Sequence, residues 1–178
     1  GTPFTELLEM TGGIWKGRKL KAVIPGGPST AVLPASAIMG ATMDYEGLSK
    51  AGSSLGAGSM IVMDDTTCMV TTLKRLSYFF YEESCGQCTP CREGTGWMDK
   101  VIKRIETGKG RMEDIDLLVD VAKKIEGNTI CPLGDAASWP VAAAIRHFRD
   151  EFEWHVTHPE EATKPGAVYM RPGASWAI

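Results

Sequence analysis

The chain has 178 residues, of which 43% are hydrophobic and 23% are charged. This composition is typical of a globular protein and excludes a disordered chain or a fibrous repeat. The net charge of −3 gives no general attraction to nucleic acid or to an anionic membrane. No apolar run in the sequence approaches the roughly 20 residues that span a bilayer. We therefore expect no nucleic-acid partner and no direct membrane insertion.

The first third of the chain predicts a small unit that mixes short strands with one clear helix. The helix is expected over Pro3–Met10, with Thr2 as its cap. Short strands are expected at residues 20–24, 31–33 and 60–63, the last of them buried. The segment 44–48 is ambiguous between helix and loop. Residues 1–65 therefore predict an α+β unit.

From residue 66 onward, apolar residues recur three to four positions apart, which is the spacing of amphipathic helices. Helices are predicted over 66–83, 90–106 and 112–126, and a fourth begins near Ser138 and continues through Phe148. Their short connections favour an antiparallel four-helix bundle over residues 66–155. Three large aromatic residues are interpreted as core: Trp97, Trp139 and Phe148. Residues 156–178 contain three prolines and predict an extended tail.

The cysteines carry the strongest chemical signal. There are five, an odd number, and three of them fall within seven residues, in a sequence that shows no secretory signal. Such crowding favours metal ligation over a disulfide framework. Cys85, Cys88 and Cys91 form a C-x-x-C-x-x-C motif, a spacing that lets three sulfurs wrap three corners of a 4Fe–4S cubane. Cys131, which is separated from Cys91 by 39 residues, is the candidate ligand for the fourth iron. The sequence therefore predicts one 4Fe–4S cluster.

The residues around the triplet suit an anionic cluster. Four thiolates bring negative charge, which has to be compensated where it is buried. Thr89 and Pro90 predict a helix cap and a first helical residue, which places Cys91 beside free backbone N–H groups and the positive end of the helix dipole. Arg92 is expected to add charge-assisted hydrogen bonds, and Gly86 to let the backbone approach inorganic sulfur.

Other interpretations of the cysteines remain open. Structural zinc usually takes two C-x-x-C pairs or a Cys/His mixture, which this triplet matches poorly. Radical enzymes that cleave S-adenosylmethionine leave one iron without a cysteine and usually space their triplet C-x-x-x-C-x-x-C. With a full set of four cysteines, electron transfer is favoured over chemistry at the cluster. Cys68 and the three histidines are expected to be packing or surface residues rather than ligands.

Several runs of residues resemble one known family. The run ESCGQCTPCREG at 83–94, followed by Trp97-Met98, resembles the NADH-binding flavoprotein subunit of respiratory complex I. Four further runs do so too: LKAVIPGG at 20–27, IEGNTIC with LGD between 125 and 135, WPV at 139–141 and IRHF at 145–148. The resemblance covers about residues 1–155.

This resemblance implies a soluble-ligand-binding, ubiquitin-like β-grasp domain over residues 1–65, with its N-terminal part missing. It also implies a helical domain over residues 66–155 that holds one 4Fe–4S cluster, with the four ligands matched one for one: Cys85, Cys88, Cys91 and Cys131. In that family NADH reduces FMN on a further N-terminal domain, and the flavin passes single electrons to this cluster and onward to quinone. The glycine-rich FMN and NADH region is missing here, so we expect a fragment that does not oxidise NADH alone.

The implied partners are other subunits of a multi-subunit NADH dehydrogenase complex, including further iron–sulfur subunits. The implied location is peripheral, on the cytoplasmic side of the bacterial inner membrane or the matrix side of the mitochondrial inner membrane. An alternative is the equivalent diaphorase subunit of an NAD-reducing hydrogenase or of an NAD-dependent formate dehydrogenase. An alternative from another class is a non-redox interaction module with structural zinc.

Overall fold

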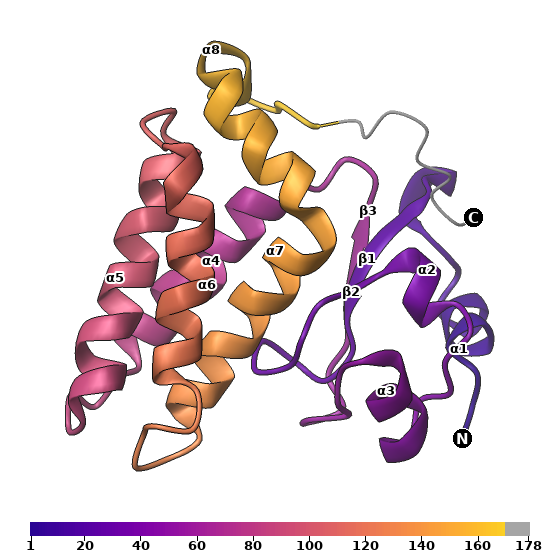
Figure 1. Cartoon of the computed structure of the whole chain (residues 1–178). Coiled ribbons are helices and arrows are strands. Elements are labelled where there is room, and N and C mark those ends of the chain that lie inside the picture. The colour runs from indigo at the N-terminus through magenta and orange to yellow at the C-terminus, as the bar shows by residue number, and fades with distance from the viewer. Residues whose placement is uncertain (170–178) are drawn as a thin grey trace. The chain divides into compact units, whose positions relative to one another are not determined.

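The computed structural model of the chain describes residues 1–169, which fall into two compact units (Figure 1). One unit contains Gly1–Thr67, and the other begins at Cys68 and continues through the rest of the described residues. The predicted α+β class is confirmed, since a three-stranded antiparallel sheet is accompanied by helices. Within residues 1–169, every helix is too short or too polar to cross a membrane.

The first unit is built around a sheet with the strand order β2-β1-β3. Its strands are β1 (Leu20–Ile24), β2 (Leu33–Pro34) and β3 (Ile61–Asp64), and its helices are α1 (Phe4–Met10), η1 (Trp15–Gly17), α2 (Ala35–Ile38) and α3 (Tyr45–Ala51). Val23 of β1 pairs with both neighbouring strands, and the whole of β1 is buried. The core is made by six fully buried side chains: Phe4, Leu20, Val23, Leu33, Ile38 and Leu48.

Three details of this unit differ from expectation. Residues 45–48 of the ambiguous segment belong to α3, because the Asp44 carboxylate accepts a hydrogen bond of 2.6 Å from the Gly47 N–H and caps the helix. The strand β3 is not fully buried, since Ile61 and Val62 are 38% and 40% exposed. Its position at the edge of the sheet explains this exposure. Helix α1 is preceded by Pro3 as its N-cap, so Thr2 is not the cap.

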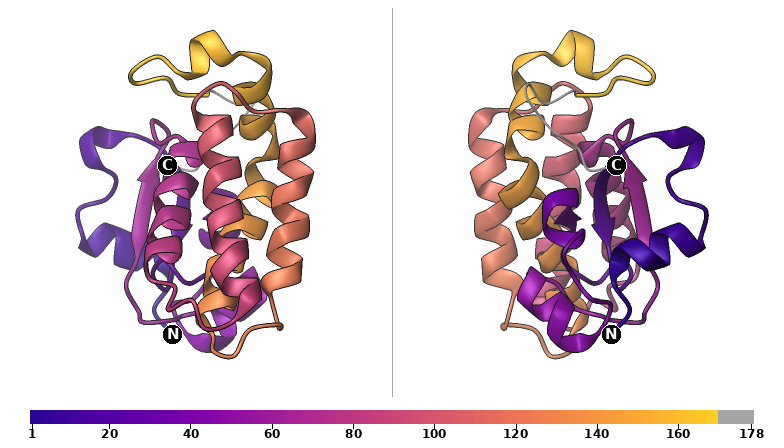
Figure 2. Two further views of the ribbon diagram at one scale, coloured as in Figure 1. Left: turned by 90° about the vertical axis from the view of Figure 1, so that its left-hand side faces the viewer. Right: turned by 90° about the vertical axis from the view of Figure 1, so that its right-hand side faces the viewer.

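The second unit consists of the helices α4 (Met69–Glu82), α5 (Thr89–Glu106), α6 (Met112–Ile125), α7 (Leu133–Thr157) and α8 (Pro159–Ala162). Helix α5 packs against α4, α6 and α7, and α7 packs against α4, α6 and α8. The side views keep the four long helices next to one another (Figure 2). Their shared core includes five side chains that are at most 2% exposed: Leu73, Met98, Ile102, Leu118 and Phe152.

The predicted start of the fourth helix at Ser138 is wrong, because α7 begins at Leu133 and includes Pro140 in its interior. A proline lacks one backbone N–H, so it favours the first turn of a helix, but the packed and buried environment of Pro140 tolerates the missing bond. Helix α7 also continues past Phe148, whose φ of −130° departs from helical geometry. The predicted extended tail contains α8 in its described part, and its residues 170–178 lie outside the described residues.

The interpretation of three aromatic residues as core is wrong for two of them. Trp97 is 55% exposed and Trp139 is 39% exposed, whereas Phe148 is buried as predicted. Trp97 shares a four-residue spacing with Val101 and Ile105, but each four-residue step turns a helix by about 40° beyond a full circle. Two steps therefore carry Trp97 well off the buried stripe of α5.

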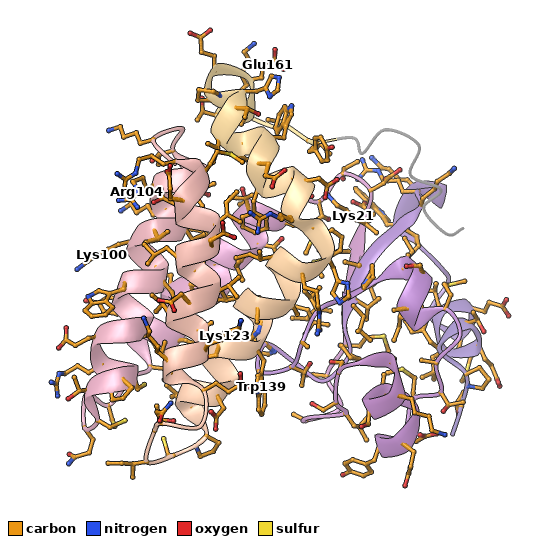
Figure 3. All side chains as sticks on the ribbon, in the orientation of Figure 1. Lys21, Lys100, Arg104, Lys123, Trp139 and Glu161 are labelled. Carbon is orange, nitrogen blue, oxygen red and sulfur yellow. The ribbon has the colours of Figure 1, made fainter. Side chains whose placement is uncertain are left out.

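A buried carboxylate joins the two ends of the α5–α6 connection. The Asp114 side chain is 1% exposed and accepts hydrogen bonds from the guanidinium of Arg104, with Nε 2.8 Å from Oδ2, and from the Arg111 backbone N–H at 2.9 Å. Burial opposes its ionisation, but these hydrogen bonds outweigh burial and hold the pKa of Asp114 below its usual value. Arg104 lies on the upper part of α5 in Figure 3.

We predict that Asp114→Asn lowers the free energy of unfolding by about 2–3 kcal/mol, because Arg104 loses its charged partner and one carboxylate acceptor, while the Asn amide oxygen still accepts from the Arg111 N–H. Since the folded pKa is lowered, this contribution is complete at neutral pH and is lost only as the pH falls through that pKa. Urea unfolding at pH 7, followed by circular dichroism under anaerobic conditions, measures the change.

The matched control is Asp116→Asn in the same helix. Asp116 also bonds an arginine, Arg149, at 2.7 Å, but its side chain is 70% exposed. We expect no comparable loss, because water screens an exposed ion pair. Equal losses in the two variants contradict the role assigned to the buried carboxylate.

Candidate metal centre

The four predicted ligand cysteines lie in two connections between helices. Cys85 lies in the α4–α5 connection, Cys88 is the N-cap of α5, and Cys91 is in its first turn. Cys131 lies in the α6–α7 connection, next to the N-cap residue Pro132. Figure 1 shows both connections at the lower end of the helices, with the α5–α6 connection at the opposite end. The helical unit therefore brings both cysteine segments to one end.

The pKa of the Cys91 thiol is affected by burial and by the other three cysteines. Burial raises the pKa of the Cys91 thiol, and the charges of Cys88, Cys131 and Cys85 raise it further. A hydrogen bond with Ser84 acts in the opposite direction. Cys131 therefore acts on the ionisation of Cys91, although 39 residues separate the two in sequence. Cys91 is 6% exposed, whereas Cys85 and Cys131 are exposed.

The spacing of the possible ligands is wide. In residues 1–169, no three His, Cys, Asp or Glu side chains are grouped closely enough to hold a single metal ion. A cubane differs from a mononuclear site because each of its irons takes one cysteine sulfur. The donor set fits a four-iron cluster in number and kind, since the two connections at one end of the helices carry four thiols.

Local hydrogen bonds hold the triplet loop. Gly86 has a φ of +74°, a conformation that favours glycine, and this accounts for its place in the loop. The Arg92 guanidinium donates to the Gly86 carbonyl at 3.0 Å and is also paired with Glu93 at 2.9 Å. Arg92 therefore holds the backbone of the loop in place. The sequence analysis had predicted a different role for it, namely hydrogen bonds to the cluster. The Ser84 hydroxyl lies 3.3 Å from Cys91 Sγ.

The start of α5 differs by one residue from the prediction. Cys88 is the N-cap, and Thr89 and Pro90 are the first two helical residues. Within the described chain no side chain caps this helix, so its first N–H groups, from Thr89 and Cys91, have no such partner. These groups and the positive end of an 18-residue helix lie beside two of the cysteines, where they stabilise negative charge.

The segment before Cys131 is held by contacts that the sequence did not reveal. The Asp135 carboxylate accepts a hydrogen bond of 2.7 Å from the Gly127 N–H, and the Thr129 hydroxyl donates to the Cys131 carbonyl at 2.9 Å. A Cβ at Gly134 would lie 2.4 Å from Thr129 Cγ2, so a glycine is needed there. The indole N–H of Trp139 donates to Glu126 at 2.7 Å, near the lower end of α7 in Figure 3.

Cys68 occupies a different place. It is the N-cap of α4, whereas the triplet loop follows the other end of that 14-residue helix, about 21 Å away at 1.5 Å per residue. Its Sγ lies 3.3 Å from His155 Nε2. Burial raises the pKa of the Cys68 thiol above its usual value. The Glu151 carboxylate accepts from the Met69 N–H at 2.9 Å, a cap supplied by α7.

Comparison with known proteins defines the class of this centre. Residues 71–155 match the family described as the NADH-ubiquinone oxidoreductase-F iron-sulfur binding region. The matched residues include Cys85, Cys88, Cys91 and Cys131 and leave out Cys68. The helical unit is thus an iron–sulfur binding region.

Relatives that match most of this chain show a similarity beyond the helical unit. The chain is 50% identical over 169 residues to the F 1 subunit of the NADH-quinone oxidoreductase of Rhizobium meliloti (strain 1021), covering 93% of this chain and 39% of that protein. It is 53% identical over 150 residues to the F subunit of the Rhodobacter capsulatus enzyme, covering 83% of this chain and 35% of that protein. The chain belongs to the family of NADH-quinone oxidoreductase F subunits, as its resemblance indicated, and corresponds to the C-terminal part of these relatives. It spans less than two fifths of their length.

A solved structure is similar as well. The crystal structure of an NAD⁺-reducing [NiFe]-hydrogenase in the H2-reduced state has a TM-score of 0.70 and 29% sequence identity. The similarity covers 78% of this chain and 24% of the hydrogenase chain. A chain of an NAD⁺-reducing hydrogenase therefore shares this fold.

We predict that Asp135→Ala loosens the segment that carries Cys131. The Gly127 N–H loses its acceptor, and a hydrogen bond worth about 0.5–1.5 kcal/mol corresponds to roughly two- to tenfold faster amide exchange at residues 127–131. Hydrogen exchange followed by mass spectrometry measures this. Asp120→Ala is the control, since it removes an exposed carboxylate that pairs with Lys124 at 2.6 Å in α6. Unchanged protection of residues 127–131 in Asp135→Ala shows that the bond does not hold the segment.

Proposed function

We propose that the chain binds one 4Fe–4S cluster through Cys85, Cys88, Cys91 and Cys131 and relays single electrons through it. The observation that carries this proposal is that the two connections with the four cysteines lie at one end of the helical unit (Figure 1), within the match to an iron–sulfur binding region. When bound, such a cluster takes up and gives back one electron at a time.

The surroundings of the cysteines support this assignment. Thiolates are the usual ligands of 4Fe–4S clusters, and the first turn of α5 supplies N–H donors and a positive dipole next to Cys88 and Cys91. One of the proposed ligands is buried and two are exposed, so one side of the site is shielded from water while the other is open to solvent. An electron relay needs both conditions, since burial tunes the potential and exposure lets donor and acceptor approach.

The relatives suggest the wider context. We infer that the longer protein is the NADH-oxidising subunit of an NADH-quinone oxidoreductase, in which FMN on a further domain feeds this cluster and other iron–sulfur subunits receive its electrons. It is then a peripheral subunit, on the cytoplasmic side of a bacterial inner membrane or the matrix side of a mitochondrial one. Residues 1–178 alone are expected not to oxidise NADH.

The same context bears on the fold. We propose that the β2-β1-β3 sheet and its helices form part of a β-grasp domain over about residues 1–65. Helices α4 to α7 then form the antiparallel four-helix bundle over about residues 66–155. The pairwise packing of α5 with α4 and α6, and of α7 with α4 and α6, supports the bundle.

A second candidate is the diaphorase subunit of an NAD-reducing hydrogenase or an NAD-dependent formate dehydrogenase. The structural similarity to the NAD⁺-reducing [NiFe]-hydrogenase favours it. The quinone-reducing context is preferred because identity to the Rhizobium meliloti relative is 50% over nearly the whole chain, against 29% to the hydrogenase. Neighbouring genes distinguish the two: genes for a membrane arm support the first, and hydrogenase or formate dehydrogenase genes support the second.

The test of the relay is metal analysis with EPR of the anaerobically purified, dithionite-reduced chain. We predict about four irons per chain and the signal of a reduced cluster in the unmodified protein. Cys131→Ser is expected to lose the cluster or convert its signal, since one iron loses its thiolate, while circular dichroism shows that the helices persist.

Cys68→Ser is the matched control, because it removes a cysteine that is separated from the site by the length of α4. It is expected to keep iron content and the EPR signal unchanged. Iron loss in Cys68→Ser, or an unaltered signal in Cys131→Ser, contradicts the ligand assignment. One zinc per chain without iron supports the interaction module instead.

A further inference from the structure

A hydroxyl group reaches one of the four ligand sulfurs. The Ser84 Oγ lies 3.3 Å from Cys91 Sγ, within hydrogen-bond distance for sulfur. Ser84 follows the end of α4 and directly precedes Cys85, so its position is fixed by the same loop that carries the triplet. The contact joins a half-buried side chain to a buried sulfur.

The direction of this hydrogen bond follows from the chemistry of the two groups. Either atom can donate while Cys91 is a thiol. A metal-bound thiolate has no proton, so Ser84 has to donate and the sulfur accepts. The Gly86 N–H donates to Ser84 Oγ at 3.4 Å, which occupies a lone pair of the hydroxyl and leaves its proton for the sulfur. The loop thus orients a donor toward Cys91.

The burial of Cys91 increases the effect of that donor. Cys85 and Cys131 are exposed, so water hydrates their sulfurs whether or not a side chain does. Cys91 is 6% exposed, and a hydrogen bond there acts in a medium of low dielectric constant, where it is electrostatically stronger. Replacing the hydroxyl by a methyl group gives water little access to restore the bond.

We propose that Ser84 raises the reduction potential of the cluster by donating a hydrogen bond to Cys91 Sγ. An added electron increases the negative charge on the sulfurs, so the donor stabilises the reduced cluster more than the oxidised one. Ser84 is a positioning and tuning residue rather than a ligand. This inference rests on the proposed cluster, and iron analysis of the unmodified chain tests that condition separately.

The experiment is an EPR-monitored redox titration of the full chain and its variants, each purified anaerobically with its iron content measured. Ser84→Ala is expected to keep its iron and to shift the midpoint potential to a more negative value. Ser84→Thr and Ser84→Val form a second pair of nearly equal shape, in which only Thr keeps the hydroxyl. We expect Thr to stay near the unmodified potential and Val to shift with Ala.

The control is Ser77→Ala, which removes a buried hydroxyl of α4 that has no hydrogen-bond partner within residues 1–169. Its potential is expected to be unchanged. Equal potentials in the unmodified chain, Ser84→Ala and Ser84→Val show that the tuning role is wrong. Iron loss in Ala and Val but not in Thr also overturns it, because the hydroxyl then holds the cluster. Iron loss in all three variants overturns it too, because cluster binding then requires the exact size of the Ser84 side chain.

Discussion

The constraint on which the helical unit depends is the gathering of four cysteine side chains at one end. Burial raises the pKa of the Cys91 thiol, and the charges of the other three cysteines raise it further. The chain meets this constraint by topology. Helix α5 runs away from the triplet for 18 residues, and α6 returns over 14, so a separation of 39 residues in sequence becomes proximity in space. The buried Asp114 beside Arg104 secures the far end of that return.

The two cysteine segments are held in place by different contacts. The kind of contact depends on whether the segment carries three cysteines or one. The triplet lies within seven residues, so local bonds suffice: Arg92 to the Gly86 carbonyl and Ser84 to Cys91. The lone Cys131 has no neighbouring ligand to restrain it. Its segment is tied instead to the start of α7 through Asp135 and Gly134. A remote ligand needs such support because its position depends on the packing of α6 and α7.

The features that could be predicted from the sequence are those that a local residue pattern determines. The periodicity of apolar residues found α4, α5 and α6 to within three residues at each end, and the triplet spacing indicated the kind of centre. It misplaced the start of α7, because Pro140 resembles a first-turn residue while tertiary packing accommodates it in the interior. It also missed the bonds of Ser84 and Asp135. A hydroxyl or carboxylate has many possible partners, and only the folded backbone selects one.

The exposure of the proposed ligands supports the proposed relay over a purely structural centre. A structural ion is best enclosed, because every exposed ligand invites exchange with water or competing metals. Here Cys85 and Cys131 are exposed while Cys91 is buried beside the N-terminus of α5. The helix dipole and the Ser84 hydroxyl lie on the buried side, away from the exposed cysteines that a partner would approach. A centre with this division can exchange electrons through its exposed cysteines, while the groups around its buried cysteine keep its reduction potential constant.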